Sequence, residues 1–164
     1  MPDRAVDLEH PANAAVLRRR LRNANGAAPD LAPEEVADHA GLGTHPDLLE
    51  HFWYGITDGI PDAARCRRIV YGRPALVSPA SGVVFGIAGG THYYALRLPP
   101  AEREAALAVG GTRVVHYRGH PEINVPPSTD DLAELGEEWV FCAGIPDERR
   151  WCRAARAFAD AAPR

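Results

Sequence analysis

Arginine, tyrosine and histidine side chains recur along the stretches of this sequence that we expect to form strands. An arginine guanidinium binds a carboxylate or phosphate through two parallel hydrogen bonds, and tyrosine or histidine can complete such a site. We therefore take these side chains as candidate ligand- or partner-binding residues, with a small anion as a possible ligand; they are Arg68, Tyr71, Arg73, His92, Tyr93, Arg97 and His116. The alternative is that they form solvated strand faces and pair with the 22 acidic residues.

Other reactive side chains are not spaced as catalysis or metal binding requires. His116 and His120 are four residues apart but lie at a predicted strand end, not on a helix. No serine lies in a GxSxG motif, and the cysteines fall in stretches that look buried. We predict no catalytic residue, no metal site and no cofactor, although a catalytic histidine or cysteine stays open as an alternative.

The basic residues of the chain are all arginine, because lysine is absent. This excludes the lysine of a phosphate-binding P-loop, of a Schiff base and of a kinase. The net charge of −4 makes nucleic acid an unlikely partner, in spite of the arginines within "RRRLR" at 18–22. We interpret that helix as a docking or capping element.

The location of the protein is predicted from its cysteines and apolar runs. No apolar run reaches the length of a membrane span, and the N-terminal residues lack the apolar core of a signal peptide. Three cysteines, an odd number without CxxC spacing, favour reduced thiols over a disulfide framework. We expect a cytoplasmic protein that has no membrane partner.

The elements that must position these residues follow from apolar periodicity and from the placement of proline and glycine. We expect helices at 11–24, 44–59, 99–111, 128–136 and 146–162, and a helical turn at 33–41. We expect five strands, at 67–78, 83–88, 92–99, 112–119 and 137–144, the first of them at an edge or bulged because of Gly72 and Pro74. This order, α-β-β-β-α-β-β-α after an N-terminal helical extension, indicates an α+β protein with a mainly antiparallel five-stranded sheet whose helices pack on one face.

The segment "GVVFGIAGGTHYYALRLP" is apolar on both faces of its predicted hairpin. Strand alternation places Val84, Gly86, Ala88 and Ala95 on the face opposite the bulky core residues. We expect this smooth strip to be covered by residues 11–24, by a second subunit or by a ligand. The stripe of the first helix would be Ala14, Leu17 and Leu21, and the main core Phe52, Trp53, Phe85, Leu96 and Trp139.

Part of this pattern resembles the YjbR and TfoX N-terminal-like domains. The resemblance covers about residues 46–161 and includes "RRIVYG", the hairpin above and the ending "EEWVFCAGIPDERRW"; it is carried by Tyr71, Gly72, Phe85, Arg97, Tyr117, Trp139 and Val140. Val84 and Arg97 stand where the family usually has lysine, and residues 118–136 also depart from its pattern. The resemblance implies helices packed on one face of a five-stranded sheet, and a loose link to DNA binding or regulation.

Together these observations predict an N-terminal helical extension at 1–42 and a YjbR/TfoX-like α+β domain at 43–164. The predicted function is that of a small cytoplasmic regulatory or partner-binding protein without catalytic activity, as a homodimer or with a protein partner. One alternative is a small-molecule-binding protein or enzyme that uses the arginine, histidine and tyrosine cluster. A second is a nucleic-acid-binding regulator.

Overall fold

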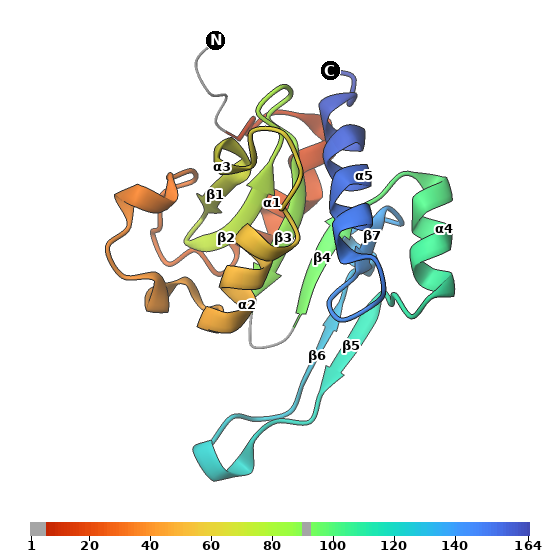
Figure 1. The fold of residues 1–164 in the computed structure, drawn as a ribbon. Helices are drawn as coiled ribbons and strands as arrows, with labels where there is room; N and C mark the ends of the chain where they lie inside the picture. The colour runs from red at the N-terminus through yellow and green to blue at the C-terminus, as the bar shows by residue number, and fades with distance from the viewer. Residues whose placement is uncertain (1–5, 90–92) are drawn as a thin grey trace.

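A five-stranded antiparallel sheet forms the centre of the protein (Figure 1). The computed structural model describes residues 6–89 and 93–164. The strand order is β1-β2-β3-β4-β7, with bounds Arg67–Val70, Arg73–Val77, Val84–Gly89, Tyr93–Arg97 and Trp139–Phe141. Each neighbouring pair runs antiparallel. The predicted α+β class and the five-stranded antiparallel sheet are confirmed.

Within the described residues, five α-helices accompany the sheet: α1 (Ala14–Leu21), α2 (Pro46–Glu50), α3 (Ala63–Cys66), α4 (Pro100–Ala108) and α5 (Glu148–Asp160). The expected helix at 44–59 is shorter than predicted, because α2 continues as a π-helical turn over His51–Gly55. Short 3₁₀ turns occur at Pro11–Asn13, Pro33–Glu35, His39–Leu42, Pro121–Ile123 and Ala133–Leu135. Helices α2 and α5 lie in front of the sheet in Figure 1, and α1 lies behind it.

The predicted broken strand at 67–78 is in fact a hairpin of β1 and β2. The turn consists of Tyr71 and Gly72, both with positive φ, 48° and 80°. A two-residue turn with two positive φ angles matches the twist of the strands it joins. Gly72 and Pro74 therefore mark the end of one strand and the start of another, and the hairpin supplies two of the five strands.

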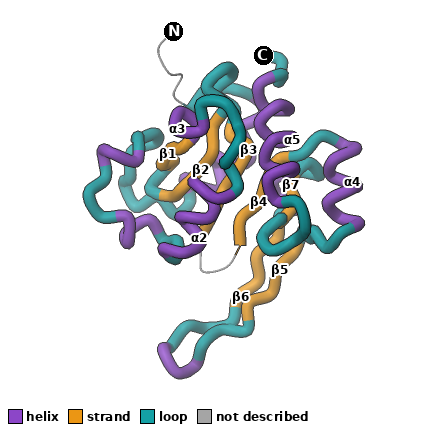
Figure 2. The backbone as a smooth tube through the Cα atoms, in the orientation of Figure 1, coloured by secondary structure: helices purple, strands orange, loops and turns teal. Residues whose placement is uncertain are grey.

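The largest departure from the prediction lies at 112–131. Strand β5 (Val114–Tyr117) does not join the main sheet; it pairs with β6 (Ser128–Asp131) in a separate two-stranded ribbon. The helix expected at 128–136 is thus a strand followed by a 3₁₀ turn. The backbone groups of β6 pair with β5 along four residues, and this ladder replaces the hydrogen bonds of a helix. Residues 113–131, called the arm below, extend away from the sheet (Figure 2).

One face of the sheet carries the larger hydrophobic core. Phe52, Trp53, Phe85 and Leu96 lie in it, as predicted, together with residues of α5. Trp139 is also buried, but it lies in the cluster on the opposite face. The predicted core is therefore divided between the two faces.

A bulge in β3 changes which of its side chains share a face. The register against β2 shifts between Leu76 and Val77, so that Val84 and Gly86, but not Phe85, have partners there. A Cβ on Gly86 would meet Phe52 and leucine side chains of the core. The predicted strip of Val84, Gly86, Ala88 and Ala95 is wrong in part: Gly86 and Ala88 face the core, and Ile87 takes their place.

Helix α1 covers the second face of the sheet. Its Val16 and Leu17 pack with Val84, Ile87 and Ala95. The expectation that residues 11–24 cover this face is confirmed, and a second subunit is not needed for that purpose. The predicted stripe of the helix is right at Leu17 and wrong at Ala14 and Leu21, which are exposed, while Arg20 is buried.

The segment before α1 is joined to the sheet by a buried asparagine. The Asn13 side-chain amide donates to the carbonyls of Asp7 and Gly82, and its oxygen accepts from the N–H of Val84. These bonds connect the start of α1 to the start of β3. They fix the direction in which the helix crosses the sheet. No helix within residues 6–89 and 93–164 is long and apolar enough to cross a membrane.

Candidate functional site

A cavity of about 360 Å³ lies between α1, one end of the sheet and the arm. Its volume falls at the small end of the range of about 300–1,000 Å³ that is typical of ligand pockets. We call it the arginine cavity because three guanidinium groups line it. The lining residues are Arg19, Arg20, Asn23, Arg73, Ile87, Ala88, Gly89, Tyr93, Val115, Tyr117, Val125, Ser128, Asp130 and Phe141.

Arg20 is the most unusual residue of the cavity, because only 5% of it is exposed. Its Nη2 donates to the carbonyl oxygens of Pro74 and Ala88, at 2.7 and 3.2 Å. Its Nη1 is buried with no hydrogen-bond partner in the described part of the chain. A buried charge without an acid partner is costly, and burial, with the neighbouring charges of Arg73 and Arg19, lowers the pKa of Arg20.

Arg73 enters the same cavity from the start of β2. Its guanidinium lies against two glycines: a Cβ would be 2.7 Å from Nη1 at Gly43 and 3.7 Å from it at Gly89. Gly43 has a φ of +70° and no side chain, so the guanidinium can lie close to that backbone. No acid residue among those described forms an ion pair with Arg73. Arg20 and Arg73 therefore place two uncompensated positive charges beside one cavity.

The third arginine is neutralised by the arm. Arg19 forms ion pairs with Asp130 of β6 and with Glu134, and Arg22 pairs with Glu134 as well. The pair with Asp130 attaches α1 to the arm, and the pairs with Glu134 attach it to the 3₁₀ turn that follows the arm. They leave the net charge of the cavity lining at about +2 from Arg20 and Arg73. The geometry thus provides a positive site that an anion would complete.

The remaining wall of the cavity is mostly apolar and aromatic. Tyr93 and Phe141 lie edge to face, with ring centroids 6.2 Å apart. The sheet adds Ile87, and the arm adds Val115 and Val125. A ligand of this cavity would contact guanidinium groups on one side and rings or branched side chains on the other.

Two of the seven predicted site residues, Arg73 and Tyr93, line the arginine cavity. Arg68 instead pairs with Asp30 at 2.7 Å. Tyr71 lies in the β1–β2 turn and packs partly against the α1-side cluster. His92 lies outside the described residues.

The other two predicted residues also lie elsewhere. Arg97 is buried, pairs with Glu138 at 2.7 Å and lies over the ring of Phe158. His116 contacts Thr129 through Nδ1 on the arm. The six of these residues that the structure describes therefore do not form one cluster, and only Arg73 and Tyr93 line the same cavity.

Sequence reasoning missed the contribution of α1 and of the arm. A signal for Arg20 was present, since Val16 and Arg20 are four residues apart and must share a helix face. The contribution of Tyr117, Ser128 and Asp130 had no such signal, because it depends on where the arm lies relative to the sheet.

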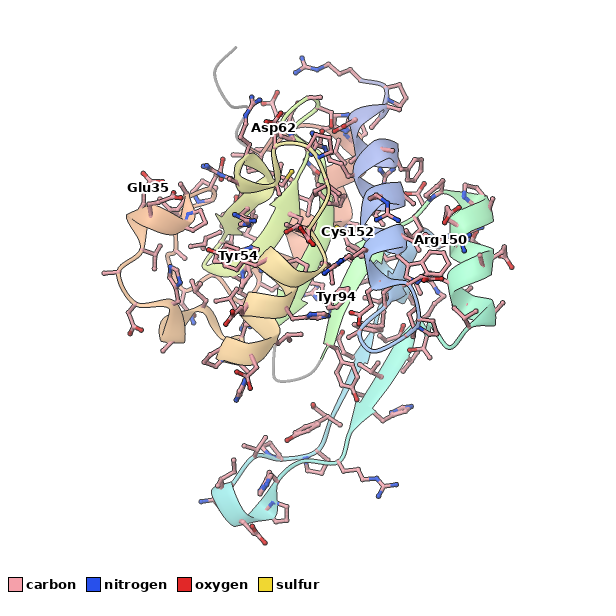
Figure 3. All side chains as sticks on the ribbon, viewed as in Figure 1. Glu35, Tyr54, Asp62, Tyr94, Arg150 and Cys152 are labelled. Atoms are coloured by element: carbon pink, nitrogen blue, oxygen red, sulfur yellow. The ribbon has the colours of Figure 1, made fainter. Side chains whose placement is uncertain are left out.

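A second polar cluster on the core face joins the start of the π-helical turn to α5 and includes Tyr94, which is labelled in Figure 3. Glu148 accepts hydrogen bonds from the Tyr94 hydroxyl and, at 2.7 Å, from His51 Nε2. Burial, followed by the bond to Glu148, raises the pKa of Tyr94. Because these groups satisfy one another, the cluster explains how the two helices are held together.

The three cysteines are free and buried within the core face. Burial raises the pKa of Cys66 to about 11 and those of Cys142 and Cys152 to about 12. Thiols of this kind are poor nucleophiles at neutral pH. Among the described residues, no group of three or more histidine, cysteine or acid side chains is placed to hold a metal ion.

Comparison with known proteins adds no relative. No protein-family model, no curated protein and no solved structure matches this chain. The similarity to YjbR and TfoX N-terminal-like domains therefore stays a prediction. The function has to be argued from the cavity itself.

Proposed function

We propose that this protein binds a small anionic molecule in the arginine cavity. The observation that carries the proposal is that Arg20, which lines the cavity together with Arg73, is buried and has an Nη1 without a hydrogen-bond partner among the described residues. Folding a positive charge into the protein without an acid partner costs free energy. An anion in the cavity would accept from both guanidinium groups and remove that cost.

The lining of the cavity favours binding over catalysis. Its described residues include no histidine, cysteine or glutamate, and Asp130 is engaged by Arg19. The hydroxyl groups of Tyr93, Tyr117 and Ser128 also line the cavity, but the described lining offers no histidine or unpaired carboxylate to activate them as nucleophiles. We therefore propose a regulatory protein of the cytoplasm in which the bound anion acts as the signal.

The rival proposals receive less support from the described residues. The "RRRLR" helix has little charge to offer a nucleic acid, since Arg19 and Arg22 pair with acids and Arg20 is buried. A homodimer through the sheet face would require α1 to move away. A protein partner at another surface is compatible with anion binding.

The proposal can be tested by native mass spectrometry of two samples: the protein as purified, and the protein after unfolding and refolding to release any bound molecule. We expect a small anion to be retained, or thermal stability to rise when anions are added, because a ligand of the folded state stabilises it. The variant Arg73→Gln should lose this response, and Arg153→Gln, an exposed arginine on α5, should keep it. Equal responses of both variants to every anion would refute the proposal.

A further inference from the structure

We infer that the ligand of the arginine cavity is an aromatic monocarboxylate, a conclusion that rests on the proposed anion-binding function. The anionic group would lie between Arg20 Nη1 and Arg73, and the ring would lie against Tyr93, Phe141 and the arm. Three features of the cavity lead to this chemical class: its charge, its oxygen neighbours and its aromatic wall.

The two unpaired guanidinium groups of the site fit the two oxygens of one carboxylate. Arg20 and Arg73 supply the uncompensated positive charge, while Arg19 is already paired with Asp130. Nη2 of Arg20 is occupied by two carbonyls, so that Nη1 is the group left to donate. A planar carboxylate can accept from Nη1 with one oxygen and from Arg73 with the other.

The surroundings of Arg20 disfavour a second negative charge. The carbonyl oxygens of Pro74 and Ala88 lie beside its guanidinium. Arg20 and Asn23 also stand at the C-terminal end of α1, where the helix dipole is negative. A phosphate dianion would be repelled by these oxygens more strongly than a carboxylate. The site therefore favours a monoanion.

The remaining lining residues of the cavity indicate the chemistry of the uncharged part of the ligand. Tyr93, Tyr117 and Phe141 line the cavity together with Ile87, Val115 and Val125. Aromatic side chains favour aromatic partners through offset or edge-to-face packing. A volume of about 360 Å³ limits the ligand to a small ring system.

Isothermal titration calorimetry with benzoate, indole-3-acetate, their primary amides and inorganic phosphate tests this inference. We expect at least one acid to bind with 1:1 stoichiometry, and its amide to bind at least 10-fold more weakly, because the amide keeps the ring and loses the charge. Phosphate should also bind more weakly than that acid. Arg73→Gln should weaken binding of the acid at least 10-fold, while Arg153→Gln leaves it unchanged.

The outcomes separate this inference from the function on which it rests. Equal affinity for an acid and its amide, or binding of phosphate that Arg73→Gln abolishes while neither acid binds, would overturn the aromatic carboxylate. In the second case anion binding itself stands. If neither acid nor phosphate binds, and Arg73→Gln leaves the anion response of thermal stability unchanged, both proposals fail.

Discussion

The two faces of the central sheet are built in different ways. The core face buries Phe52 and Trp53 of the π-helical turn together with Phe85 of β3 and residues of α5, and its polar groups, such as Tyr94 and Glu148, satisfy one another. The α1 face is thinner, and next to its apolar cluster it holds a buried arginine and a cavity.

If the protein binds an anion as proposed, one face of the sheet serves mainly stability and the other mainly binding. Close packing on the core face gives the free energy that holds the sheet together. The α1 face leaves the charges of Arg20 and Arg73 uncompensated, which is unfavourable for folding and favourable for an anion. Substitutions on the two faces should therefore have different consequences, and the following experiments test that expectation.

The largest effect on stability is expected for Phe85→Ala. Phe85 is fully buried on the core face, so the substitution leaves a cavity and should lower the free energy of unfolding by roughly 3–5 kcal/mol. Urea denaturation measures this loss. Its unfolding curve should keep a single transition, and a midpoint equal to that of the parent protein would contradict the assignment of this face.

The pH dependence of stability should also come from the core face, which holds all three thiols. Because burial raises their pKa to about 11–12, the folded thiols keep protons that the unfolded chain loses above about pH 9. Unfolding then releases protons, so the contribution of the thiols to stability falls as pH rises above 9, by at most about 1.4 kcal/mol per thiol and pH unit. Urea midpoints at pH 8, 9.5 and 10.5 measure the slope, and Cys152→Ala should make it shallower. An unchanged slope would contradict the burial of this thiol.

Replacing the buried arginine of the α1 face should affect binding more than stability. Arg20→Met removes an uncompensated charge, which is favourable, and takes a donor from two carbonyls, which is unfavourable. We expect a net change in the free energy of unfolding below about 1.5 kcal/mol, with the anion response lost. A loss as large as that of Phe85→Ala would show that Arg20 is mainly a structural residue.

The smallest effect on global stability is expected at the turn of the arm. Gly119 has a φ of +82°, and a Cβ there would lie 2.6 Å from the carbonyl oxygen of Val125. Gly119→Ala should disorder the arm locally and change the global free energy of unfolding by less than about 1 kcal/mol, since a two-stranded ribbon adds little stability. Hydrogen exchange should increase within 113–131 only. Protection lost across β3 and β4 as well would mean that the arm supports the main sheet.

The strands of the main sheet followed from sequence where local pattern and tertiary pairing agree, as in β3 and β7. The secondary structure could not be predicted where one local pattern is compatible with both a helix and a strand. Ser128 is a typical residue for the start of a helix and Gly136 for its end. Ser128 nevertheless begins a strand, because β5 supplies backbone hydrogen-bond partners to that strand. The bulge at Phe85 could not be predicted either, because the sequence pattern indicates only that side chains alternate strictly between the two faces of a strand.

The candidate site was likewise predicted only in part, because local sequence patterns indicate some of its residues and not others. Arg73 and Tyr93 lie at strand ends, where sequence places polar groups correctly. Arg20 is different: within four arginines at 18–22 it resembles a solvated residue, and only its helical spacing from Val16 indicates burial. Residues of the arm reach the cavity through three-dimensional placement, which no local pattern encodes.

The hydrogen bonds of Asn13 have a consequence for the order of folding. Its partners Gly82 and Val84 lie 69 and 71 residues further along the chain, so α1 cannot take its final position until β3 has formed. Arg20, two helical turns after Asn13, reaches the carbonyls of Pro74 and Ala88 only after that step. We expect the cavity to be the last part of the protein to be completed, so a ligand would bind only chains that have finished folding.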